Sequence, residues 1–210
     1  MMLEREVAKR VFAQEYNASN LTFKESDDQY SPLYLLTSTG AKCNRVFITG
    51  TLTEKEDIGA TAEHWRARIA DPTGVFTIYA GQYQPEAAQM LSAIEPPQFV
   101  AVVGKTNTYD TGEGIITSIR PESIQMIDVE TRDRWILETA KHTLERIAAL
   151  GSDNADAIKA REHYSPDLER YKQMVLQALK SIGKRQISEK KTEEGKAEKV
   201  EFEVMDLSKS

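Results

Sequence analysis

The sequence contains little that could bind a metal or form a disulfide. It has one cysteine, Cys43, and three histidines, His64, His142 and His163, which lie far apart along 210 residues. One cysteine cannot form an internal disulfide or a zinc site built from several cysteines. Isolated histidines are typical of surface or packed side chains. We therefore expect no metal and no cofactor, and the scarcity of cysteine favours a reducing, cytoplasmic location.

Long apolar runs and catalytic motifs are also missing. No stretch approaches the roughly 20 apolar residues that a membrane helix needs, so we expect no membrane partner. The sequence has no glycine-rich phosphate-binding loop, no H-E-x-x-H pair and no nucleophile elbow. These absences predict a protein that is not an enzyme.

The sequence has fewer basic than acidic residues. The chain has 27 lysines and arginines against 33 acidic residues, which gives a formal net charge of −6. Neutralisation of phosphates is the sequence-independent source of affinity for nucleic acid. The balance therefore argues against a strongly basic, non-specific nucleic-acid binder, but it leaves room for a local basic groove on an acidic body.

The stretch WRARIADPTGVFTIYAGQYQP, residues 65–85, predicts a β-hairpin. Apolar residues at alternate positions place Arg66 and Arg68 together on the opposite face of the first strand. Residues 71–74, Asp-Pro-Thr-Gly, have the composition of a type I turn, and residues 75–80 are rich in β-branched and aromatic side chains. The two arginines, together with nearby tyrosines, indicate a surface for a phosphate backbone and unstacked bases. A solvated strand face beside a core aromatic is the plainer alternative.

The hairpin lies inside a predicted five-stranded domain. Strands are expected over residues 44–53, from 65 to the turn at 71–74, and over 75–80, 99–105 and 115–119, with a helix over 86–94 and a last extended piece over 123–127. A helix between the third and fourth strands is the order of an OB-fold, a partly open Greek-key barrel. Gly50, inside the first strand, predicts a bulge or sharp bend.

Helices are expected on both sides of this domain. One is predicted over residues 3–16, followed by an irregular arm over 20–40 that contains a short extended piece at 33–36. After the barrel, apolar stripes predict helices over 131–150, 153–163 and 167–182. The expected organisation is an N-terminal helix and irregular arm (1–41), an OB-fold domain (42–128), a helical region (129–183) and a charged disordered tail (184–210). Residues 200–204 of the tail could form a strand or interaction motif against a partner, but a solubilising tail is the plainer interpretation.

OB-fold topology predicts where a ligand would bind. Strands two and three, with the loops after strands one and four, form the ligand face of such a barrel. Tyrosines would stack on bases and cations would follow the phosphate backbone. The candidate nucleic-acid-binding residues are Arg66, Arg68, Tyr79, Tyr83, Lys105, Tyr109 and Arg120. A stacking surface alone does not separate DNA from RNA, so an RNA-binding module stays open.

Several segments resemble one family. They are NRVFITGTLTE (44–54), much of 66–88, FVAVVGK (99–105), SIRPESI (118–124) and RDRWILETAKHTLERI (132–147). Together they resemble the archaeal replication protein A-associated proteins, OB-fold proteins similar to the middle subunit of a replication protein A heterotrimer. The matches span roughly residues 3–150, and DPTGVFTIYAGQYQPEA is long enough to be specific.

The resemblance implies single-stranded DNA binding within a hetero-oligomer that serves DNA replication, repair and recombination, in association with the nucleoid. It implies base stacking around Tyr79–Tyr83 and at Tyr109. It also implies that the helix after the barrel packs against other replication protein A-like subunits. The candidate partner-interface residues are Trp135, Ile136, Ala140, Leu144 and Ile147. The acidic balance keeps open an assembly subunit that makes little DNA contact of its own.

Overall fold

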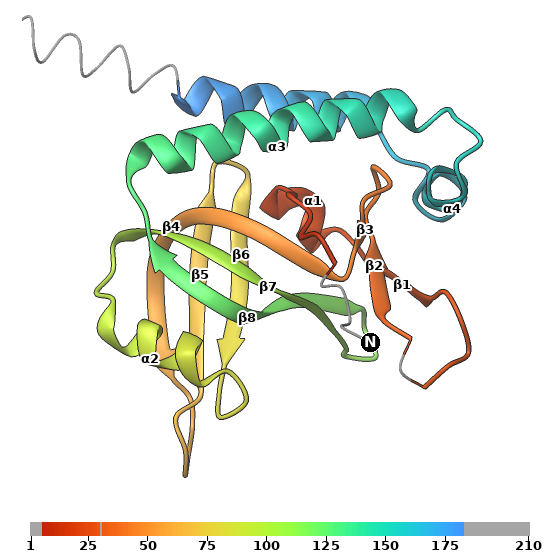
Figure 1. Ribbon diagram of the computed structural model, residues 1–210. Helices are drawn as coiled ribbons and strands as arrows, with labels where there is room; N and C mark the ends of the chain where they lie inside the picture. Colours follow the sequence, from red (N-terminus) through yellow and green to blue (C-terminus); the bar gives the residue numbers. More distant parts are fainter. Residues whose placement is uncertain (1–5, 30, 183–210) are drawn as a thin grey trace, which may run out of the picture.

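The central feature of the computed structural model, which describes residues 6–29 and 31–182, is a closed five-stranded barrel (Figure 1). Its strands are β4 (Arg45–Asp57), β5 (Trp65–Asp71), β6 (Gly74–Ala80), β7 (Gln98–Asp110) and β8 (Ile115–Met126), in the order β4-β5-β6-β8-β7. Helix α2 (Pro85–Ala93) joins β6 to β7. This is an OB-fold, and it confirms the predicted fold class.

Alternation along the strands fills the barrel. Ile48, Ile69 and Phe76 are fully buried, and each lies at an inward position of its strand. With Phe76 inside, the parity of β6 places Tyr79 on the outer face. Gly50 is needed for a close approach, because a Cβ there would lie 2.4 Å from the carbonyl oxygen of Ala70. The register shift in β4 comes just after it, between Leu52 and Glu54.

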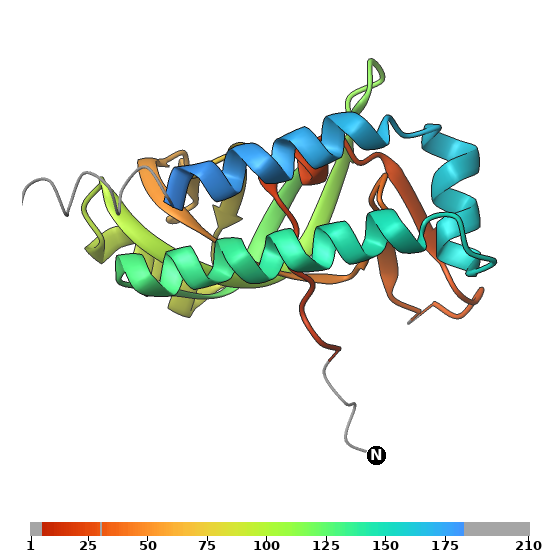
Figure 2. The same ribbon diagram turned by 90° about the horizontal axis from the view of Figure 1, so that it is seen from above.

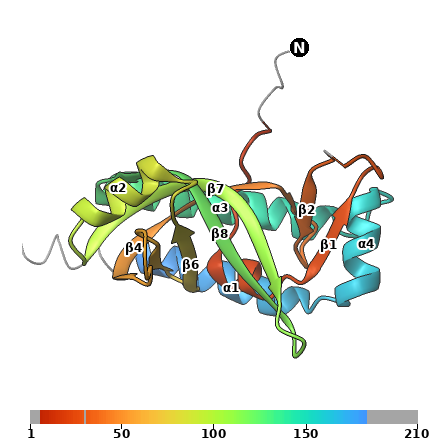
Figure 3. The same cartoon turned by 90° about the horizontal axis from the view of Figure 1, so that it is seen from below.

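Three barrel strands extend beyond the predicted limits. β4 runs on to Asp57, and β7 runs to Asp110. β8 is one strand where two pieces were predicted, because Pro121 lies at an irregularity in the pairing with β7, between Val103 and Gly104. A proline is tolerated at such a bulge since a ladder hydrogen bond is not required there. The long β7–β8 hairpin therefore projects from the barrel (Figure 3).

The predicted helix over residues 3–16 is wrong for most of its described length. Residues 6–12 have no regular secondary structure apart from an isolated bridge at Lys9, which pairs in parallel with Val46, and only α1 (Ala13–Asn17) is helical. Val11 and Phe12 are fully buried in the main core. These apolar residues are therefore inserted into the barrel and do not form the apolar stripe of a helix. The hairpin turn holds the start of α1, because the Asp71 carboxylate accepts a hydrogen bond of 2.8 Å from the Ala13 amide.

Helix α1 fills a gap in the barrel wall. β6 and β8 pair at one position only, Ile78 with Ile119. Beside this pair the Tyr16 hydroxyl donates to the carbonyl oxygen of Ser118 (2.7 Å), and the Asn17 amide donates to the carbonyl oxygen of Val75 (2.8 Å). α1 therefore supplies hydrogen bonds where the two strands separate.

The segment predicted as an irregular arm is a small sheet. β1 (Leu21–Lys24), β2 (Leu33–Leu36) and β3 (Lys42–Cys43) form a three-stranded antiparallel sheet, of which the sequence predicted only residues 33–36. Its apolar partner is supplied from far along the chain, since Leu36 packs with Leu150, Ala157 and Ala160 in a second core. Burial against distant residues explains why the local sequence of β1 and β3 gave no strand signal.

The C-terminal helices form where they were predicted. They are α3 (Val129–Ala149), α4 (Ala155–Tyr164) and a helix over 168–182. Asp128 and Asn154 cap α3 and α4 by accepting hydrogen bonds from amides of the first turn. α3 and the helix over 168–182 lie side by side above the barrel (Figures 1 and 2).

Two predictions concern other parts of the chain. The tail over 184–210, with the segment 200–204, lies outside the described residues. Within the described residues, no helix is long and apolar enough to cross a membrane.

Candidate nucleic-acid interface

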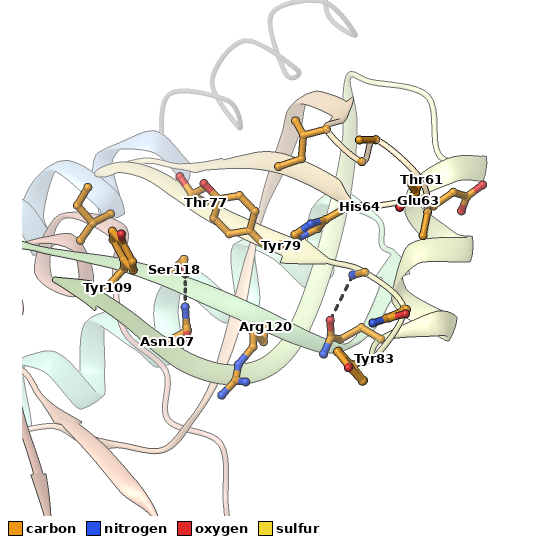
Figure 4. A pocket seen from close by; sticks show the side chains of 18 of the residues that line it. Thr61, Glu63, His64, Thr77, Tyr79, Tyr83, Asn107, Tyr109, Ser118 and Arg120 are labelled. Carbon is orange, nitrogen blue, oxygen red and sulfur yellow. Dashed lines mark hydrogen bonds between the residues drawn. The ribbon is translucent and has the colours of Figure 1, made fainter. Parts of the chain in front are cut away.

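A groove of about 960 Å³ lies on the outer face of the barrel, where β6 and β8 separate (Figure 4). Its floor comes from β6, β7 and β8, and its rims are the β4–β5 loop (58–64) and the turn over 81–84. Outward positions of the strands line it, as the alternation in β6 requires. The groove shares β6 and the loop after the first strand with the ligand face that OB-fold topology predicts, but no residue of β5 lines it.

Three tyrosines are spaced along the groove. Tyr109 and Tyr83 lie at its two ends with Tyr79 between them (Figure 4). The side chains at the ends are free to stack, since Tyr109 is 68% exposed and Tyr83 is 83% exposed. Tyr79 is half-buried, and the His64 ring meets it edge-on with 6.1 Å between the ring centroids. All three tyrosines predicted from the sequence therefore share one surface.

The floor of the groove is polar and held in place. The Asn107 amide donates to the Ser118 hydroxyl across the β7–β8 pair (3.1 Å). From inside the barrel, Tyr16 donates to the carbonyl oxygen of the same Ser118. Ser118 is 5% exposed. These hydrogen bonds hold Ser118 in place, so the side chains next to it project from a fixed stretch of backbone.

The β4–β5 loop is organised by one carboxylate. The Asp57 Oδ1 accepts hydrogen bonds from the amides of Gly59 (2.9 Å) and His64 (3.0 Å). These bonds hold the pKa of the Asp57 carboxyl below its usual range, because they favour the charged form. The loop is closed further by the Ile58 amide, which donates to the carbonyl oxygen of His64 (2.8 Å). His64 is thereby fixed against Tyr79.

Sequence reasoning missed His64 and Asn107 as groove residues. His64 was assigned to the surface or to packing, and Asn107 was not considered. The position of the β4–β5 loop in OB-fold topology was the available signal for His64. No local pattern marks Asn107, whose role depends on its partner across the strands.

Two of the four predicted cations face this region. Arg120 lines the groove, and Lys105, its cross-strand partner, lines an adjoining depression of about 400 Å³. The two hollows share Tyr83, Gln84 and Arg120, so they form one continuous path. Among the described residues, no carboxylate lies within ion-pair distance of either cation. Glu122 pairs with Arg45 rather than with Arg120.

The other two predicted cations lie beside the groove and are paired. Arg66 forms an ion pair with Glu56 (2.5 Å), and Arg68 lies 3.9 Å from Glu54. Arg66 is opposite Tyr79 in the β5–β6 register, so it shares the outer face, but neither arginine lines the groove. Their charge is partly compensated by β4, which continues along β5 to Asp57.

The predicted partner-interface residues are mostly covered by the chain itself. Trp135 donates its indole N–H to the carbonyl oxygen of Phe47 (2.9 Å) and meets the Phe12 ring edge-on at 5.7 Å. Trp135, Ile136, Ala140 and Ile147 are exposed by 7% or less and belong to the main core. Leu144, the fifth residue of the set, is 43% exposed. The inner stripe of α3 thus packs within the fold.

Comparison with known proteins gives similarity at the level of structure. No protein-family model and no curated protein matches the sequence. A chain of the S. pombe Stn1–Ten1 complex superposes with a TM-score of 0.52 at 12% identity, over 73% of this chain and 96% of that one. A chain of a replication protein A heterotrimer bound to single-stranded DNA gives 0.48 at 15% identity, over 67% and 98%. The second single-stranded DNA-binding protein of Mycobacterium smegmatis gives 0.35 at 15% identity, over 42% and 89%. At these identities, the likeness to the Stn1–Ten1 chain establishes that this protein has an OB-fold.

Proposed function

We propose that this chain is a single-stranded DNA-binding OB-fold subunit of a replication protein A-like complex that acts in DNA replication, repair and recombination. One observation carries the proposal: Tyr79, Tyr83 and Tyr109 lie along one groove whose path includes two unpaired cations, Arg120 and Lys105. Exposed tyrosine rings can stack only on bases that are not stacked within a duplex. The groove therefore suits a single strand.

The geometry supports a division of the groove into two sides. Arg120 and Lys105 belong to β8 and β7, whereas Tyr79 and His64 belong to β6 and the loop before β5. In our proposal the phosphates pass Lys105 and Arg120, and the bases turn toward Tyr79 and toward Tyr109 near the end of β7. Base–aromatic stacking contributes about 1–3 kcal/mol per base, so two or three tyrosines supply most of a weak, sequence-tolerant affinity.

Fluorescence anisotropy with a labelled oligo-dT at low salt tests the proposal. We expect Tyr79→Ala and Tyr109→Ala each to weaken binding by about ten-fold, which corresponds to roughly 1.4 kcal/mol for one lost stacking contact. Leu33→Ala is the matched control, since Leu33 is 49% exposed on β2 and does not line the groove. Unchanged affinity in both tyrosine variants would remove the assignment.

A second candidate function is that of an assembly subunit whose barrel makes little DNA contact. The observation that favours it is the small number of unpaired cations along the groove. Other subunits would then provide most of the phosphate contacts. Co-expression with a large replication protein A-like subunit, followed by size-exclusion chromatography, tests for the complex. Oligo-dT binding of the complex and of the chain alone then separates the two roles.

RNA is a further candidate ligand for the same groove. Stacking surfaces do not distinguish ribose from deoxyribose. Competition between oligo-rU and oligo-dT of equal length decides between them. Our proposal requires that oligo-rU competes more weakly.

A further inference from the structure

Residues on the outer sides of β7 and β8 meet in three steps along the groove. Residues that are directly opposite in the register share one face, and positions two apart on a strand are separated by about 6.8 Å. The three cross-strand pairs are Lys105 with Arg120, Asn107 with Ser118, and Tyr109 with Ile116. Asn107 therefore lies between the cations and Tyr109, as Figure 4 shows.

The carboxamide of Asn107 is fixed at one end. Its Nδ2 donates to the Ser118 hydroxyl (3.1 Å), the bond drawn as a dashed line in Figure 4. Ser118 is held in turn by Tyr16, which donates to its carbonyl oxygen (2.7 Å). Among the described residues no donor bonds the Oδ1 atom of Asn107, and this atom is not buried. Asn107 thus offers the groove one acceptor in a fixed position.

Other polar side chains of the groove are less selective. Thr77, on β6, has a hydroxyl that can donate or accept. Gln82 and Glu63 are exposed on the two rims. Asn107 is half-buried and is anchored across the strands. A base that stacks on Tyr109 therefore has Asn107 as its fixed polar neighbour, one step along β7.

A single acceptor separates the bases by their exocyclic groups. Cytosine and adenine carry an amino group, which donates, whereas thymine carries a carbonyl oxygen at the corresponding position, and uracil carries the same oxygen. The Oδ1 atom of Asn107 accepts a hydrogen bond from the amino group. Against a carbonyl oxygen it loses its water and stays unpaired, which is unfavourable.

We propose that Asn107 selects bases by this contact, so that the groove favours cytosine and adenine over thymine and uracil. The inference rests on the proposed single-strand binding, because stacking on the tyrosines must first bring a base to Asn107. Stacking gives the sequence-tolerant part of the affinity, and Asn107 adds a preference to it. Lys105 and Arg120, one step further along the strands, hold the phosphate and so limit how far the base can slide.

Fluorescence anisotropy with labelled oligo-dC and oligo-dU of equal length tests the preference at slightly alkaline pH, where cytosine is unprotonated. The two bases have the same size and differ at the exocyclic group and the adjacent ring nitrogen, and neither carries the thymine methyl group. We expect oligo-dC to bind about five-fold more tightly, which is the typical effect of one hydrogen bond. Asn107→Leu should make the two affinities equal. A preference that survives Asn107→Leu would overturn the proposal.

Two further variants separate the contact from general damage to the fold. Asn107→Asp retains an acceptor oxygen, so it should weaken the binding of both oligomers by repelling phosphates but keep the preference for oligo-dC. Ser118→Ala removes the anchor of the amide, so it should reduce the preference without abolishing binding. Loss of the preference in Asn107→Asp would count against Oδ1 as the selecting atom.

Tyr79→Ala is the matched control, since it should weaken both oligomers alike and leave the ratio of their affinities unchanged. If the tyrosine variants bind more weakly but the unmodified chain binds oligo-dC and oligo-dU equally, this inference is wrong and the proposed function stands. Unchanged binding in the tyrosine variants would overturn both. A preference for oligo-dU would also overturn the inference, because the amide N–H groups would then face the groove.

Discussion

Asp57 shows how one side chain shapes the groove. Asp57 is exposed at the end of β4. Its carboxylate accepts hydrogen bonds from the amides of Gly59 and His64, and these bonds close the β4–β5 loop. Because these bonds lower its pKa, the stability that they provide is fully present above the usual carboxyl range. It is lost as the pH falls through the lowered pKa.

We therefore expect Asp57→Ala to loosen the loop at neutral pH. The Gly59 and His64 amides should exchange with deuterium faster than in the unmodified chain, after correction for intrinsic rates. In the unmodified chain the same loss of protection should appear only in acid. Asp110→Ala is the control, since Asp110 accepts from the Gly112 amide in the same manner at the tip of the β7–β8 hairpin. Unaltered protection at Gly59 and His64 would contradict this role.

Residue patterns predicted which side of a strand a side chain faces, but they did not predict which side chain it pairs with. Alternation along residues 65–69 correctly separated the buried Ala67 and Ile69 from Arg66 and Arg68. The pairing of Arg66 with Glu56 was not predictable, because it requires β4 to continue beyond the predicted end of the first strand. Charge compensation between strands depends on register, which local sequence does not specify.

Among the elements, α1 and α3 are joined by a buried ion pair. Glu15 is fully buried, and its carboxylate accepts from Arg146 (3.0 Å) and from the Thr39 hydroxyl (2.5 Å). Arg146 also donates to Thr39 (2.9 Å). Helix α3 is therefore attached to the N-terminal segment by charge as well as by apolar packing.

Arg146→Met should destabilise the protein by about 3 kcal/mol, because it leaves the Glu15 carboxylate buried without its cation. Adding Glu15→Gln should recover part of this loss, so the two effects should not be additive. Urea unfolding monitored by fluorescence measures both. Lys172→Met, which breaks the exposed pair with Glu169, should change stability by about 0.5 kcal/mol or less. If Arg146→Met lowered the free energy of unfolding as little as Lys172→Met does, the Glu15 carboxylate would have to be accessible to water.

Helices were predicted correctly where an apolar stripe repeats over several turns, and incorrectly where only a few apolar residues had helical spacing. The C-terminal helices have long apolar stripes and caps at Asp128 and Asn154, and they form as predicted. In the N-terminal segment, Val7 and Val11 have helical spacing by coincidence, since Val7 is 78% exposed and Val11 is buried. The β1–β3 sheet depends on α4, more than one hundred residues later.

For the whole molecule, charge sets the salt dependence of DNA binding. Two unpaired cations along the groove predict a slope of log affinity against log salt of about −1.4 for single strands. Lys105→Ala or Arg120→Ala should reduce the slope to about −0.7. Arg66→Ala and Arg68→Ala should leave it nearly unchanged, because both arginines already face carboxylates. A slope much steeper than this in the unmodified chain would mean that Arg66 and Arg68 release their partners and bind phosphate.

The fold as a whole was more predictable than its site. Five strands with a helix after the third have few closed arrangements, so strand order followed from element order. The groove was predicted in outline because its tyrosines lie on one barrel face. Its loop geometry and its continuation toward Lys105 arise from contacts between elements that no single stretch of sequence encodes.

The insertion of α1 between β6 and β8 has a consequence for the synthesis of the protein. Tyr16 and Ser118 are separated by 102 positions, so the floor of the groove joins an early part of the chain to a late one. Contacts of such long range form slowly in folding. Since the chain leaves the ribosome N-terminus first, α1 must wait for β8 to emerge before it can dock. A nascent chain therefore cannot complete the groove floor until most of the barrel has been translated.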